Sequence, residues 1–68
     1  MAIDVQRLEL GDVVLVDLGE GSPEVEAKVI RPIDRSETSV RVSLRAEEGE
    51  EFVREWPLGE QVIVVRGP

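Results

Sequence analysis

Residues 39–46 alternate polar and apolar side chains at every position, in the order Ser-Val-Arg-Val-Ser-Leu-Arg-Ala. A period of two is typical of a β-strand with one face on a core and the other in water, because successive side chains of a strand point to opposite faces. The alternation continues over all eight residues without an error. It therefore predicts a half-buried strand, against which the rest of the chain can be aligned.

Four further segments complete the pattern of an all-β chain. They are short and rich in β-branched residues, which favour strands, and turns with glycine or proline separate them. The five predicted strands are 13–18, 24–30, 39–46, 51–56 and 61–66. We expect them to form one antiparallel small barrel, because closing a sheet removes the open edges that invite aggregation.

The core of this barrel has to stabilise the fold alone. The chain has 68 residues, enough for one domain, and neither cysteine nor histidine is present to form a disulfide or a structural zinc site. The alternation assigns one face of each strand to the interior. The predicted core residues are Val14, Val16, Val25, Ala27, Val29, Val40, Val42, Leu44, Val62 and Val64.

Three short motifs in this order resemble Src homology 3-like barrels, in particular Tudor and KOW-type modules. Gly-Asp-Val-Val at 11–14 opens the first strand, 38–42 is similar to the middle hairpin of a Tudor domain, and Pro-Leu-Gly-Glu at 57–60 falls where such barrels place a 3₁₀ turn. The resemblance covers residues 9–66. It implies a five-stranded antiparallel Src homology 3-like (Tudor-like) barrel.

The two aromatic residues, Phe52 and Trp56, share one face of the strand predicted at 51–56. Tudor domains that bind methylated side chains have an aromatic cage, and two aromatic residues supply too few walls for one. Burying an aromatic side chain stabilises a fold more than burying Val53 on the opposite face, which favours a core role for Phe52 with Trp56 covering one end of the barrel. The alternative is that both form an exposed anchor for a partner, as aromatic residues do at interface hot spots.

The first and last predicted strands are apolar on both faces, whereas a half-buried strand needs only one apolar face. In a Src homology 3-like barrel these two strands would be neighbours, so their outward residues would form one patch. The predicted patch consists of Val13, Leu15, Ile63 and Val65. Such a patch on a small protein needs a cover. We expect the N-terminal segment 1–10 to cover the barrel domain 11–66 there, and a homodimer or a protein partner is the alternative.

The sequence contains few residues that could act in catalysis or bind a metal ion. Histidine, cysteine and tyrosine are absent, and no serine has a visible base to activate it. A barrel of this size has an interior filled by side chains, which leaves no room for a catalytic cleft. The glutamates around Gly49 stand at near-adjacent positions that point to both faces, unlike a calcium-binding loop. We therefore expect no enzyme, no cofactor, no metal site and no small-molecule substrate.

These observations predict a non-enzymatic interaction module that binds a protein partner or self-associates. No apolar run approaches the roughly 18 residues of a membrane span and no secretory signal is visible, so a cytoplasmic protein is expected. The alternative function is that of a KOW-like nucleic-acid-associated barrel in a transcription or translation complex. Only Lys28, Arg41 and Arg45 could form a basic stripe for it, together with Trp56 as a stacking platform.

We expect no nucleic-acid binding at physiological salt, because a net charge of −7 repels phosphate backbones. Fluorescence anisotropy with short labelled DNA and RNA measures this directly. A dissociation constant below roughly 10⁻⁶ M would exceed ordinary non-specific binding and would contradict the prediction.

Overall fold

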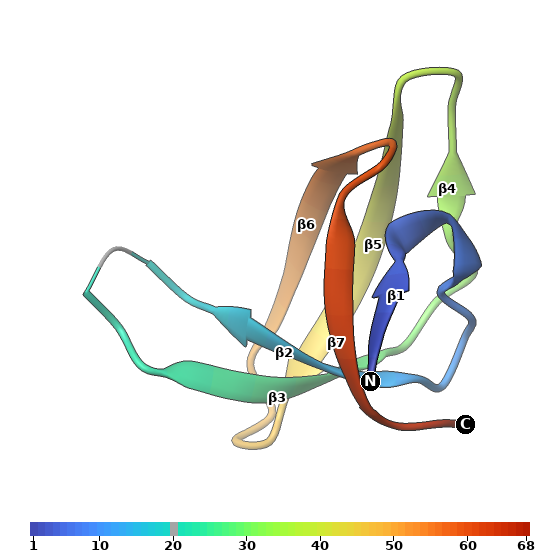
Figure 1. Ribbon diagram of the computed structural model, residues 1–68. Coiled ribbons are helices and arrows are strands. Elements are labelled where there is room, and N and C mark those ends of the chain that lie inside the picture. Colours follow the sequence, from blue (N-terminus) through green and yellow to red (C-terminus); the bar gives the residue numbers. More distant parts are fainter. Residues whose placement is uncertain (20) are drawn as a thin grey trace.

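A strongly curled antiparallel sheet of seven strands makes up the fold in the computed structural model, which describes residues 1–19 and 21–68 (Figure 1). Its elements in chain order are β1 (Ala2–Asp4), the 3₁₀ turn η1 (Val5–Arg7), β2 (Val13–Asp17), β3 (Glu24–Val29), β4 (Asp34–Arg35), β5 (Ser39–Ala46), β6 (Glu51–Pro57) and β7 (Gln61–Arg66). The all-β class is confirmed. Glu20, in the turn predicted between the first two long strands, lies outside the described residues.

Five of the seven strands coincide with those predicted, and the structure adds β1 and β4. These two have only three and two residues, too few to show a period in the sequence. The predicted first and last strands are neighbours as expected, because β2 pairs with β7 and Leu15 lies opposite Ile63. The described part of the chain therefore forms a curled sheet of seven strands, where five were expected.

The central strand is β5, which has partners along both of its edges. β6 pairs with residues 39–45 on one side, while β3 and β4 share the other side. The sheet continues from β3 through β2 and β7 to β1. Because β6 pairs with β5 alone among the described strands, the sheet forms a half-barrel with one free edge along β6.

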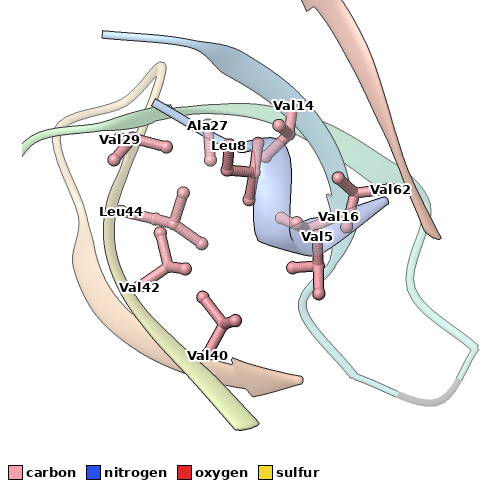
Figure 2. Packing of buried hydrophobic residues seen from close by; sticks show 10 residues of the cluster. All are labelled: Val5, Leu8, Val14, Val16, Ala27, Val29, Val40, Val42, Leu44 and Val62. Atoms are coloured by element: carbon pink, nitrogen blue, oxygen red, sulfur yellow. The ribbon is translucent and has the colours of Figure 1, made fainter. Parts of the chain in front are cut away.

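The interior of the half-barrel is an aliphatic cluster (Figure 2). The alternation in β5 is confirmed, since Val40, Val42 and Leu44 are fully buried while Arg41 and Arg45 are exposed. The buried cluster consists of Val5, Leu8, Val14, Val16, Ala27, Val29, Val40, Val42, Leu44 and Val62. Of the predicted core, Val25 and Val64 are only half-buried and pack against this cluster.

The N-terminal segment is built into the half-barrel. Its apolar residues were expected over the outer face of β2 and β7, but Val5 and Leu8 are instead fully buried in the core (Figure 2). β1 extends the sheet beside β7, and the Val5 amide donates to the Glu60 carbonyl at 2.8 Å. Arg35 on β4 fixes the end of the segment, because its Nη2 donates to the Leu8 carbonyl at 2.8 Å.

Replacing Leu8 with alanine should cost about 2–5 kcal/mol of unfolding free energy, because Leu8 is fully buried. A domain of this size rarely has more than about 3–5 kcal/mol in total, so the variant should be largely unfolded. Leu10→Ala is the matched control, since Leu10 is 52% exposed and its loss should change stability by less than about 0.5 kcal/mol. Urea unfolding followed by Trp56 fluorescence measures both variants, and equal stabilities would contradict the placement of Leu8.

Candidate functional site

A cleft of about 260 Å³ opens where β2, β6 and β7 diverge, and we call it the β6 cleft. The register between β2 and β7 runs only as far as the Leu15–Ile63 pair, so the strands separate beyond it. The turn after β6, closed by a bond from the Glu60 amide to the Pro57 carbonyl, leads β7 away from β6. Trp56 and Arg54 from β6 and Leu15 and Ile63 from the other two strands line the cleft.

The inward face of β6 carries Phe52, Arg54 and Trp56. Each lies opposite a fully buried residue of β5, namely Leu44, Val42 and Val40 respectively. Directly opposed residues of an antiparallel pair point to the same face of the sheet, which sets this orientation. Phe52 and Trp56 are half-buried against the core, and Trp56 also lines the β6 cleft.

Arg54 bridges the gap between β6 and β2, where the sheet has no backbone ladder. Its Nη2 donates to the Asp17 carbonyl at 2.6 Å, and its Nη1 lies 3.7 Å from Asp17 Oδ1. The guanidinium carbon also lies 5.8 Å from the centre of the Phe52 ring, within the range of a cation–π contact. Arg54 was not among the predicted site residues. The one signal for it in the sequence is a charged residue on the same strand face as two aromatic residues.

The predicted outer patch is only partly present as such. Leu15 is half-buried, while Ile63 and Val65 are 45% and 41% exposed. The prediction that Val13 belongs to an exposed patch is wrong. Val13 is only 7% exposed, and it lines a small recess with Lys28, Arg45 and Arg66.

A β-bulge explains why the patch is divided. The register between β2 and β7 shifts after Val14–Val64, and Val13 lies opposite Arg66, so Val65 is the extra residue. Leu15 and Ile63 remain directly paired and both line the β6 cleft. Half of the predicted patch therefore lies in the same cleft as Trp56, which no sequence pattern predicted.

The β6 cleft is acidic. Its lining contains the carboxylates of Asp17, Glu24 and Glu60 and the single guanidinium of Arg54, an excess of two negative charges. The outer face of β6 adds Glu51 and Glu55, both exposed, on either side of Val53. A ligand that enters the β6 cleft meets mainly negative charge, whereas Glu51 on the outer face is already paired with Arg45 and Arg31.

The basic residues on the outer face of the sheet are interleaved with carboxylates. Lys28 lies opposite Arg45, as the sequence analysis suggested. Arg45, however, is paired with Glu51 at 3.0 Å, and Arg66 with Glu26 at 3.0 Å. A continuous basic stripe, such as a nucleic-acid ligand would need, is therefore absent from the described surface.

A larger groove of about 760 Å³ lies between the first and last residues of the chain, and the buried Asp12 borders it. The carboxylate of Asp12 is already used in the fold, since Oδ2 accepts the Glu9 amide at 2.9 Å. Over residues 1–19 and 21–68, no group of three or more carboxylates is arranged to hold a metal ion. Asp12 beside this groove therefore has a structural role.

Comparisons of the chain with protein-family models, with curated proteins and with solved structures found no match. In the part of the chain that the structure describes, no helix has the length and apolar character needed to cross a membrane. What the protein does must therefore be inferred from its surface chemistry.

The pKa of the Glu51 carboxyl lies below the ordinary glutamate value, chiefly because Arg45 donates a hydrogen bond to it, with a smaller contribution from Arg31. A depressed pKa in the folded protein means that the ionised carboxylate stabilises the fold at neutral pH and that this contribution is lost as the pH falls through that pKa. We expect Arg45→Gln to raise the pKa of Glu51, as measured by NMR titration of its side-chain carboxyl carbon.

Arg41→Gln serves as the control for this titration, because Arg41 lies on the same strand but opposite Glu55 rather than Glu51. The pKa of Glu51 should stay depressed in this variant. Equal titration of Glu51 in both variants would show that the Arg45 contact does not hold the carboxylate in its ionised form.

Proposed function

We propose that the protein is a non-enzymatic interaction module that binds a protein partner at the β6 cleft. The observation that carries this proposal is the position of Trp56 and Arg54 in the cleft beside the partly exposed Ile63. Tryptophan and arginine are enriched at interface hot spots, and they act there from well-packed sites surrounded by apolar contacts. The half-burial of Trp56 against the core holds its ring in place, which lowers the entropic cost of binding.

The order of the long strands supports a relationship with Src homology 3-like small barrels of the Tudor or KOW type. In that order β7 lies beside β2, followed by β3, β5 and β6, and a tight turn leads from β6 into β7. Barrels of this kind carry varied ligand sites, so the proposed function depends on the cleft and not on the fold.

A protein partner is favoured over a second copy of the chain. Each copy carries a net charge of −7, and the lining of the β6 cleft is acidic. Self-association through this surface would bring like charges together, which costs free energy. The same charge argues against the KOW-like nucleic-acid-associated alternative.

Ile63→Glu should abolish binding of the partner, because it places a charge on the apolar rim of the β6 cleft. Val65→Glu is the matched control, since Val65 lies on the same strand with similar exposure but outside the cleft. In affinity capture with tagged protein, we expect a protein that is retained by the wild type and by Val65→Glu but lost with Ile63→Glu. Loss with both variants, or with neither, would contradict the proposal.

Light scattering on the purified protein tests whether the chain self-associates through the β6 cleft. We expect a monomer for the wild type and for both variants. A wild-type dimer that Ile63→Glu dissociates would assign the cleft to self-association instead.

A further inference from the structure

We propose that the free edge of β6 binds an extended, basic segment of the partner as an additional strand of the sheet. This inference rests on the proposed binding of a protein partner and specifies how the partner is held. It starts from the pairing of β6, which has β5 along one edge and no other strand in the described part of the chain (Figure 1). A free edge of this kind is a template for a further strand.

The register shows which backbone groups this edge presents. The Ala46 amide donates to the Glu50 carbonyl at 2.8 Å, and the Leu58 amide donates to the Thr38 carbonyl at 3.1 Å, one bond at each end of the β5–β6 ladder. Bonded and non-bonded pairs alternate along an antiparallel ladder. Residues 52, 54 and 56 therefore bond to β5.

The backbone groups of residues 51, 53 and 55 consequently point away from β5. The opposite edge of β5 agrees with this alternation, because the carbonyl of Ser43, an odd-numbered residue, accepts the Ile30 amide on the β3 side at 3.1 Å. Glu51, Val53 and Glu55 thus offer three amide donors and three carbonyl acceptors to an incoming strand. Pro57 has no amide hydrogen and limits the pairing at that end.

The side chains around this edge determine the charge of the incoming segment. Glu51 and Glu55 lie on the outer face of the edge, with Val53, which is 58% exposed, between them. Because Arg45 and Arg31 already hold Glu51, Glu55 is the carboxylate that this face offers to a ligand. The inner side borders the acidic β6 cleft. Oppositely charged residues directly across a sheet stabilise it and like charges destabilise it, so lysine or arginine at alternate positions of the segment fits the edge.

A second copy of the chain does not fit this requirement, because β6 paired with β6 would set acidic side chains against one another. Unselective strand pairing at this edge is also reduced by two residues. Arg54 places a charge on the inward side of the edge, and Pro57 lacks an amide donor. Together with the carboxylates they restrict the edge to segments of complementary charge. Selectivity of this kind comes from penalties on the wrong partner as well as attraction to the right one.

The test uses the full chain and a labelled seven-residue peptide of alternating lysine and valine, which matches the length of β6. In fluorescence anisotropy at physiological salt we expect this peptide to bind. The same peptide N-methylated at its lysines keeps its charge but loses the backbone amide donors that face the edge, and it should bind about tenfold or more weakly. Equal binding of both peptides would mean attraction by charge alone and would overturn the proposal.

Amide hydrogen exchange locates the bound peptide. In the free protein the amides of Glu51, Val53 and Glu55 should exchange fast, and the unmodified peptide should slow the amides of Val53 and Glu55. Protection at another edge, or no change at these amides, would overturn strand addition at β6. Protection that rises with protein concentration and without peptide would assign the edge to a second copy of the chain.

A charge-reversal pair separates the local contact from the overall charge. Glu55→Lys should weaken peptide binding about threefold or more, because it places like charge across from the lysines. Glu9→Lys changes the net charge by the same amount at an exposed residue before β2, away from β6, and should leave binding nearly unchanged. Equal loss in both variants would contradict the proposed docking site.

Failure of strand addition at β6 and failure of partner binding at the β6 cleft give different results in these experiments. If partner capture depends on Ile63 but the peptide protects no amide on β6, the interaction module stands and strand addition is wrong. If the peptide protects Val53 and Glu55 but Ile63→Glu leaves partner capture unchanged, the edge is a binding site and the β6 cleft is not the site of that partner.

Discussion

The pairing of β5 along both of its edges is the constraint on which the rest of the structure depends. Its inward residues Val40, Val42 and Leu44 are fully buried, so a shift of one residue would expose all of them and is strongly disfavoured. The fixed register of β5 in turn sets the orientation of β6. Arg54 and Trp56 point inward for that reason, and the β6 cleft lies where β2 and β7 separate beyond the Leu15–Ile63 pair.

The five long strands and most of the core could be predicted because their signal is local. A period of two is visible in any window that contains a strand, and Val40 to Leu44 show it without error. Val5 and Leu8 could not be placed in the same way, because the apolar residues of the first ten positions follow no period and their burial depends on β7 and β4, far along the chain. The bulge at Val65, which lies beside the buried Val13, has no signal in the sequence either.

The candidate site was predictable in its parts and not in its assembly. Strand parity predicted which face of its strand each of four site residues occupies, namely Leu15, Phe52, Trp56 and Ile63. The separation of β2 from β7, which brings Leu15 and Trp56 into one cleft, is a property of the curled sheet. Arg54 has its role only because Asp17 lies across the gap. Contacts of this type are tertiary, and a pattern along one strand carries no information about them.

Arginine side chains, rather than backbone ladders, span the open parts of the half-barrel. Arg54 reaches the carbonyl of Asp17 and Arg35 reaches the carbonyl of Leu8. Each guanidinium presents several N–H donors in a fixed fork, so it can bond to a carbonyl oxygen where no backbone amide of a neighbouring strand is in place.

The burial of Val5 and Leu8, together with the pairing of β1 and β7, also affects how the chain folds. The Met1 amino group donates to the Val64 carbonyl, 63 residues away, and the Val5 amide donates to Glu60. The core is thus incomplete until segments from near both ends of the sequence have met. Native structure so rich in distant contacts is typical of small proteins that fold in milliseconds to seconds, because loop closure precedes the stabilising contacts.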